Sequence, residues 1–213
     1  MSEKILLIGG GGHCKSVLDT LLETNQFSDI GIIDAKNKIG EKVFSVPIIG
    51  SDDQLSELYQ KGYHYAFVTV GSVGNTQRRV SIFRNLKKIG FTIPNIIDPT
   101  ATVSARTKMG EGIYVGKKSV INAGAIIHDG VIINTSSIVE HDCIIKEFAH
   151  ISPGAVLCGG VQVGAHTHIG ANSVVKQNVI IGSRVMIGMG SVVLKNFKDD
   201  VVAYGNPCRE ATP

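Results

Sequence analysis

Charged side chains, aromatic rings and long apolar runs are all scarce in this sequence of 213 residues. Charged residues make up 18% of the chain and aromatic residues 6%, and tryptophan is absent. The formal net charge is only +3 and there is no basic run, so we expect no nucleic-acid partner. Charges or glycines interrupt every apolar run before it reaches spanning length, and the N-terminal run is too short for a signal peptide. We therefore expect a cytoplasmic protein that does not bind membranes.

Cysteine and histidine are also too sparsely arranged to suggest a metal centre. The four cysteines include no C-x-x-C pair, which indicates neither a zinc site nor a disulfide framework. His166 and His168 alternate along the chain, but no third ligand stands at a suitable spacing. We expect thiols without a special role and no bound metal.

Glycine, by contrast, is abundant at 25 copies, and an aliphatic residue recurs every six positions through the second half of the chain. The period matches neither the helix repeat of 3.6 nor the strand repeat of 2. Four residues after each aliphatic position comes mostly a small or β-branched residue. The series has seventeen members, counting methionine: Ile97, Val103, Met109, Val115, Ile121, Ile127, Ile133, Val139, Ile145, Ile151, Leu157, Val163, Ile169, Val175, Ile181, Ile187 and Val193.

A coil with flat sides explains this period. Six residues form one short strand and one corner, and three such sides close a triangular turn of 18 residues. The aliphatic side chain points into the prism, the small residue packs beside it, and glycine or asparagine occupies the corner. Residues 18 apart are then stacked, and seventeen hexads make between five and six turns.

The first 95 residues have a different rhythm, in which strands and helices alternate. We expect strands at 4–9, 30–34 and 65–71, and helices after the glycines at 9–12, at 55–60 and at 76–90. Ser51 and Gln54 form a capping-box pattern before the second helix, and Val17, Leu18, Leu21 and Leu22 share one face of the first. The alternation predicts a small parallel sheet with helices on its faces.

Glycines 9–12 lie at a strand-to-helix turn, where backbone N–H groups and the helix dipole can hold a phosphate. Asp34 ends the second strand, a common place for an acid that binds a ribose or a base. Glycines also form tight turns for purely structural reasons, so the pattern alone leaves both interpretations open. Only three strands precede the repeat, which disfavours a nicotinamide cofactor because no second mononucleotide half is present.

The repeat resembles the hexapeptide-repeat acyltransferases, whose hexads wind into a left-handed parallel β-helix. The hand is what the resemblance implies, because the period fixes no hand and the usual crossover rule favours the opposite one. We therefore expect an α/β N-terminal domain with a small Rossmann-like parallel sheet, followed by an all-β left-handed parallel β-helix. The expected boundaries are 1–95 for the sugar-nucleotide-binding domain, 96–197 for the β-helix and 198–213 for a C-terminal tail.

Four features of the first 95 residues narrow the resemblance to one subfamily. They are the glycine motif with His13, the strand end at Asp34, the segment VPIIGSDDQL and the segment V-T-V-G71. It contains the sugar-nucleotide N-acetyltransferases, which act on UDP-linked 4-amino-6-deoxy sugars, and the sialic acid O-acetyltransferases. The resemblance implies that Gly11, Gly12 and His13 lie at the pyrophosphate. It also implies that Asp34 binds the uracil or ribose and that Gly71 lets the nucleotide approach the backbone. Ala35 stands where a related protein has a second acid.

His141 and Asp142 are the candidate catalytic residues. Acetyl transfer from a thioester to an amine needs a base near the nucleophile and hydrogen-bond donors for the oxyanion. A neutral histidine can accept the amine proton, and an adjacent carboxylate can orient its ring. A solvated corner histidine is the alternative, and the resemblance to the family motif E-H-[DE]-C favours the base. Gly159, 18 residues after His141, is the candidate oxyanion donor.

A second stack of corner residues could accommodate a long ligand. Pro153, Ala171 and Met189 follow one another at intervals of 18, and such a row suits the pantetheine arm of coenzyme A. By resemblance, Ala171, Met189 and His150 contact acetyl-CoA, the cosubstrate. His150 lies half a turn from His141 within one prism, so the two would meet only if a neighbouring subunit presented another side. We therefore expect a homotrimer with active sites between its columns.

Four functions remain to be compared. The leading one is an acetyl-CoA-dependent N-acetyltransferase acting on a UDP-linked 4-amino-6-deoxy sugar in bacterial glycan biosynthesis, by direct attack without an acyl-enzyme. Sialic acid O-acetylation would use the same base on a hydroxyl. Serine acetyltransferase activity is disfavoured because that family's N-terminal part is helical. A non-catalytic trimeric scaffold that binds a sugar nucleotide is disfavoured by the His141–Asp142 pair.

Overall fold

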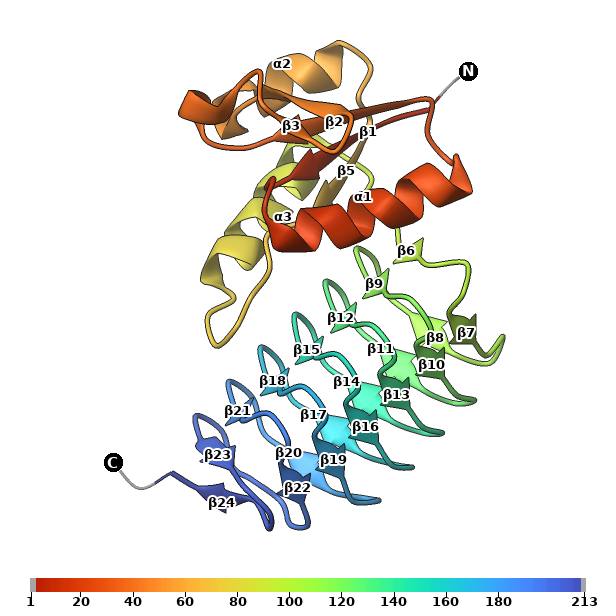
Figure 1. Ribbon diagram of the computed structural model, residues 1–213, viewed down its shortest axis with the longest axis vertical. Helices are drawn as coiled ribbons and strands as arrows, with labels where there is room; N and C mark the ends of the chain where they lie inside the picture. The colour runs from red at the N-terminus through yellow and green to blue at the C-terminus, as the bar shows by residue number, and fades with distance from the viewer. Residues whose placement is uncertain (1–2, 212–213) are drawn as a thin grey trace. The chain divides into compact units, whose positions relative to one another are not determined.

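The computed structural model describes residues 3–211, which form two compact units (Figure 1). One unit comprises the chain up to Ser72 together with Gln77–Ile96. The other comprises the chain from Ile97 onward together with the short segment Val73–Thr76, which interrupts the first unit in sequence. Thr76 fastens this segment to the second unit, because its Oγ1 lies 2.9 Å from His166 Nδ1.

The first unit is a five-stranded sheet with helices, as the alternation in the sequence predicts. Its strand order is β3-β4-β2-β1-β5, and β1 pairs in parallel with both β2 and β5. The buried strand residues, such as Leu6, Ile32 and Phe67, form its core. The elements are β1 (Lys4–Ile8), α1 (Gly12–Thr24), β2 (Asp29–Ile33), η1 (Lys36–Lys38), β3 (Lys42–Val43), β4 (Val46–Gly50), η2 (Asp52–Gln54), α2 (Leu55–Gln60), β5 (Tyr65–Val68) and α3 (Gln77–Ile89).

Two strands of this sheet escape sequence prediction. β4 contains Pro47, and β3 is only two residues long, so neither gives a clear strand pattern. They form an antiparallel pair at one edge of the sheet, next to β2. The expectation of three strands was therefore incomplete. The expected apolar face of α1 also differs in one place, because Leu22 is 41% exposed and Cys14 is buried instead. The capping box of Ser51 and Gln54 is present.

The second unit is a parallel β-helix with three faces (Figure 1). Residues 18 apart are hydrogen-bonded neighbours, as Val120, Ile138, Val156 and Val174 illustrate. We call the sheet from β7 to β22 face 1, the sheet from β8 to β20 face 2, and the sheet from β6 to β24 face 3. The seventeen hexad strands, all within residues 3–211, are β6 (Ile96–Ile97), β7 (Thr102–Val103), β8 (Lys108–Met109), β9 (Tyr114–Val115), β10 (Val120–Ile121), β11 (Ile126–Ile127), β12 (Ile132–Ile133), β13 (Ile138–Val139), β14 (Ile144–Ile145), β15 (His150–Ile151), β16 (Val156–Leu157), β17 (Gln162–Val163), β18 (His168–Ile169), β19 (Val174–Val175), β20 (Ile180–Ile181), β21 (Met186–Ile187) and β22 (Val192–Val193).

The aliphatic series of the sequence forms the core of this prism. From Val115 to Val193 every member is at most 1% exposed, and the small residues four positions later are buried beside them. The first members are less buried, because the first coil has a neighbouring coil on one side only. Ile97 is 36% exposed, and Val103 and Met109 are half-buried.

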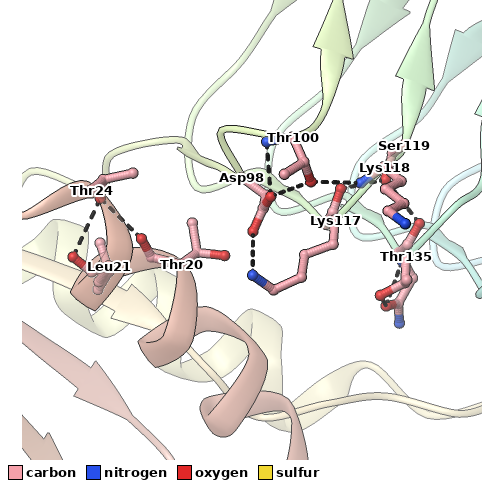
Figure 2. Close-up of polar contacts among 11 residues, drawn as sticks. Thr20, Leu21, Thr24, Asp98, Thr100, Lys117, Lys118, Ser119 and Thr135 are labelled. Carbon is pink, nitrogen blue, oxygen red and sulfur yellow. Dashed lines mark hydrogen bonds and ion pairs between the residues drawn. The ribbon is translucent and has the colours of Figure 1, made fainter.

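Polar contacts and extra strands complete the two ends of the prism. At the first coil, the fully buried carboxylate of Asp98 accepts hydrogen bonds from Thr100 and lies 3.4 Å from Lys117 Nζ (Figure 2). At the other end, β23 (Val202–Tyr204) pairs in parallel with β21, and β24 (Arg209–Glu210) pairs antiparallel with β23. Residues 202–210 therefore extend face 3. Among the helices of residues 3–211, none is long and apolar enough to cross a membrane.

Candidate active site

His141 and Asp142 form a hydrogen-bonded pair at the corner between β13 and β14. His141 Nδ1 lies 2.9 Å from Asp142 Oδ2, and both side chains are more than half exposed. Asp142 adopts the left-handed conformation, with φ of 58°, and its N–H donates to the carbonyl of Ala123 one coil earlier. This conformation, which Asp adopts more readily than most residues, is what lets two adjacent side chains meet. The Asp142 carboxylate therefore reaches the imidazole directly.

The imidazole of His141 lies against Gly159, one coil later. A Cβ atom at Gly159 would overlap the ring at Nε2 and Cε1, so only glycine leaves room for it. The two corners are tied together by the Gly160 N–H, which donates to the His141 carbonyl at 2.9 Å. Within residues 3–211, no protein group accepts a hydrogen bond from the Gly159 N–H. The corner thus combines a ring oriented through Nδ1, a second ring nitrogen for proton transfer and a backbone donor for an anion.

His150 is placed on a different side of the column, at the start of β15 on face 3. Its Nε2 lies 3.2 Å from Asn134 Nδ2, and its side chain is almost buried. The Asn134 Oδ1 accepts the N–H of Thr135 at 2.8 Å, which fixes the orientation of the amide. Asn134 therefore donates to His150 Nε2, and the proton of a neutral His150 lies on Nδ1. Sequence reasoning gave Asn134 no role, although its spacing of 16 from His150 is a regular feature of this coil.

The same geometry recurs one coil later at His168. His168 Nε2 lies 3.2 Å from Ser152 Oγ, and its ring packs edge-to-face on His150 with centroids 4.9 Å apart. Burial lowers the pKa of His168 below its usual range, because desolvation disfavours the charged imidazolium. His168 thus packs beside His150 as a ring whose neutral form is favoured. Among residues 3–211, no three histidine, cysteine or acidic side chains gather into a group that could hold a metal.

Pro153, Ala171 and Met189 are stacked at the corner that follows face 3. The N–H of Asn172 donates to the Pro153 carbonyl, and the N–H of Gly190 donates to the Ala171 carbonyl. Met189 is 81% exposed at the end of this row. The row runs along the column on an edge different from the one that carries His141. The roles of these residues toward a ligand stay predictions.

The carboxylate of Asp34 binds to the backbone of the glycine turn in the first unit. The Gly10 N–H donates to Asp34 Oδ2 at 2.8 Å, and Ala35 N–H donates to Oδ1 at 2.7 Å. Burial opposes the charge of Asp34, but these backbone hydrogen bonds and Lys38 outweigh it and lower the pKa of the carboxyl. Asp34 therefore anchors the glycine turn, which sequence reasoning did not foresee.

The remaining residues of the predicted phosphate site do gather in the first unit. Gly11 caps α1 without a side-chain hydrogen bond, and a Cβ at Gly11 or Gly12 would meet open space. His13 lies in the first turn of α1, and a Cβ at Gly71 would lie 3.6 Å from the His13 Cβ. The start of α1 therefore presents glycine backbone beside a histidine and the chain that follows β5.

Two of the four cysteine thiols are buried where ionisation is disfavoured. Burial raises the pKa of Cys14 and of Cys143 to about 11, so both are protonated at neutral pH. The four cysteines are all free.

Comparison with protein families supports each unit separately. The PglD N-terminal domain matches residues 4–86, and the bacterial transferase hexapeptide (six repeats) matches residues 142–177 and 160–195. A comparison with curated protein sequences finds no match.

Solved structures resemble the whole chain. The H141N mutant of perosamine N-acetyltransferase from Caulobacter crescentus, in complex with CoA and GDP-perosamine, is 34% identical with a TM-score of 0.93, covering 99% of this chain and 97% of its own. The acetyltransferase domain of PglB from Neisseria gonorrhoeae, in complex with acetyl coenzyme A, is 34% identical with a TM-score of 0.92, covering 99% and 100%. WeeI from Acinetobacter baumannii shares the fold at 23% identity, with a TM-score of 0.86 and coverage of 99% and 100%. The protein therefore belongs to the hexapeptide-repeat, left-handed β-helix acetyltransferases, among the sugar N-acetyltransferases.

Proposed function

We propose that the protein transfers the acetyl group of acetyl-CoA to the amino group of a nucleotide-linked 4-amino-6-deoxy sugar. The observation that carries the proposal is the His141 imidazole, bonded to Asp142 on one side and lying against Gly159 on the other. Relatives that share the fold over nearly the whole chain hold CoA with GDP-perosamine, or acetyl-CoA. The nucleotide of the sugar substrate has two candidates: the UDP that the sequence predicts and the GDP that the perosamine enzyme binds.

His141 acts as the general base of a direct attack. Its Nε2 accepts the proton that the amine loses as the amine nitrogen bonds to the thioester carbonyl carbon. Asp142 holds the ring by accepting the Nδ1 proton and stabilises the imidazolium that forms. The Gly159 N–H donates to the oxygen that carries the negative charge of the tetrahedral intermediate. When the carbon–sulfur bond breaks, His141 returns the proton to the departing thiolate, so that amide and free thiol are the products.

The two substrates are assigned to different parts of the chain. The start of α1, with Gly11, Gly12 and His13, receives the pyrophosphate, and Gly71 leaves room beside it. Asp34, which lies beside the same turn, binds the nucleoside. Acetyl-CoA lies along the row that contains Ala171 and Met189, with His150 nearby. This row and His141 occupy different edges of one column, so the proposal includes a homotrimer in which neighbouring columns complete each site.

Release of free CoA thiol tests the proposal. Purified protein is mixed with acetyl-CoA and, in turn, UDP- and GDP-linked 4-amino-6-deoxy sugars, sialic acid and serine. We expect thiol release with an amino sugar only, and a loss of roughly 100-fold or more in His141→Ala. Thiol release with sialic acid alone would support O-acetylation. If none of the acceptors causes thiol release, the non-catalytic scaffold is supported instead. His128→Ala, which removes an imidazole at the corner between β11 and β12, serves as a matched control on another edge of the column.

A further inference from the structure

The carboxylate of Asp142 has two neighbours, and only one of them is the histidine. Its Oδ2 bonds to His141 Nδ1, while its Oδ1 lies over Gly124, the residue exactly one coil earlier in the same corner. A Cβ atom built on Gly124 would collide with Asp142 Oδ1. The position of the acid therefore depends on the absence of a side chain at residue 124.

The backbone alone does not demand glycine at this corner. Gly124 has φ of 79°, but the same left-handed corner conformation is adopted elsewhere in the β-helix by residues with side chains. Examples are Lys118, Ser136, Phe148, His166 and Arg184, with φ between 55° and 62°. The space that Asp142 needs is thus a stronger reason for the glycine than the backbone conformation.

The same packing occurs at corners that carry no histidine. Asn172 places its Oδ1 over Gly154, and Asn178 places its Oδ1 over Gly160, each one coil apart. The arrangement is a general way for this coil to seat an Asp or Asn side chain over glycine. At residue 124 it seats a carboxylate whose other oxygen bonds to the proposed base. Gly130, with φ of 65°, lies under Phe148 at the same spacing and offers a comparison at the corner between β11 and β12.

We propose that Gly124 is a positioning residue for the His141–Asp142 pair, a role that rests on the proposed function of His141. An added side chain at residue 124 displaces the Asp142 carboxylate from Nδ1. His141 then loses the acceptor that fixes its tautomer, and the fraction of rings with a free Nε2 lone pair falls. Gly124 acts through Asp142 alone, so its effect disappears when the carboxylate is absent.

Gly124→Asn tests the role without imposing backbone strain, because asparagine tolerates the left-handed conformation. We expect kcat to fall roughly tenfold or more, with KM for acetyl-CoA changed less than about twofold. The double variant Gly124→Asn/Asp142→Ala should be no slower than Asp142→Ala alone. Gly130→Asn, which disturbs Phe148 on the edge that carries neither His141 nor the row of Ala171, should keep kcat near that of the unmodified protein.

The imidazole nitrogens give a readout that does not depend on activity. Nitrogen-15 NMR of the histidines should show the His141 proton on Nδ1 in the unmodified protein and a shift toward Nε2–H in Gly124→Asn. An unchanged nitrogen spectrum with unchanged kcat would overturn the positioning role. An equal loss in Gly130→Asn would overturn it too, since the effect would then be general to the coil. If His141→Ala is fully active, the proposed function fails, while the nitrogen shift still decides whether Gly124 places the acid.

Discussion

At the scale of single residues, His168 shows how the β-helix keeps an imidazole neutral. Its ring is pressed against His150, and its Nε2 bonds to Ser152. Desolvation lowers its pKa in the folded protein, whereas the unfolded chain has the ordinary value near ~6.5. The unfolded state therefore binds more protons between the two pKa values, and the free energy of unfolding rises with pH across that window. The contribution is complete above about pH 6.5 and is lost as the solution becomes more acidic.

His168→Phe should remove this part of the acid sensitivity, because phenylalanine keeps a ring against His150 and cannot be protonated. We expect the drop in Tm between about pH 7.5 and about pH 5.5, which lie on either side of the ordinary histidine pKa of ~6.5, to be smaller in the variant. Thermal unfolding in matched buffers measures it. His64→Phe is the control, because it makes the same substitution at another histidine, which packs edge-to-face on Tyr59 in the first unit. An identical pH dependence of Tm in His168→Phe and the unmodified protein would contradict the assignment.

Sequence alone predicted those parts of the site that follow from the period. The contact between His141 and Gly159 comes directly from the interval of 18, and the row of Ala171 and Met189 comes from the same interval. The interval of 18 residues does not predict the direction in which a side chain points. The bond from Gly10 to Asp34 and the seat of Asp142 over Gly124 depend on local turn geometry that hydrophobic spacing does not encode.

At the scale of elements, the same contrast separates the two units. Seventeen hexads without interruption predict the β-helix, because each coil buries the same kind of residue at the same place. The first unit has no period, so its strands must be recognised one by one. Strands β3 and β4 form the end of the sheet beyond β2. They are recognised as strands by their hydrogen bonding to each other, because their amino-acid composition is not typical of strands. The helices α2 and α3 were predicted because a capping box and terminal glycines mark their ends.

The buried column makes a prediction about coil stability. Ile145 is fully buried in β14, so Ile145→Ala leaves a cavity that neighbouring coils cannot fill, and we expect a loss of about 2–5 kcal/mol in the free energy of unfolding. Gln162→Ala is the control, because Gln162 is exposed on the same face and pairs with Ile144. It should change stability by less than about 0.5 kcal/mol. Urea unfolding followed by circular dichroism compares the two variants, and equal losses would contradict the inward orientation of the hexad residues.

At the scale of the whole molecule, the separation of His141 and His150 decides how the proposed site is assembled. One residue lies at the corner between faces 1 and 2, and the other lies on face 3. Large apolar side chains also remain exposed on the second half of the β-helix, where a neighbouring copy would cover them. They are Val174, Ile180, Met189, Leu194, Val202 and Tyr204.

Subunit mixing tests the shared site. His141→Ala and His150→Ala should each be nearly inactive alone, because each removes one half of every site. When the two are unfolded and refolded together, each site takes its two halves from different subunits at random, so about a quarter of the sites regain both histidines. We therefore expect the mixture to recover up to about a quarter of the original kcat, with the mass of a trimer measured by light scattering. Separately refolded variants that are mixed afterwards provide the control. A mixture that stays inactive would place both histidines of each site in one chain, and full activity of His150→Ala alone would remove His150 from the site.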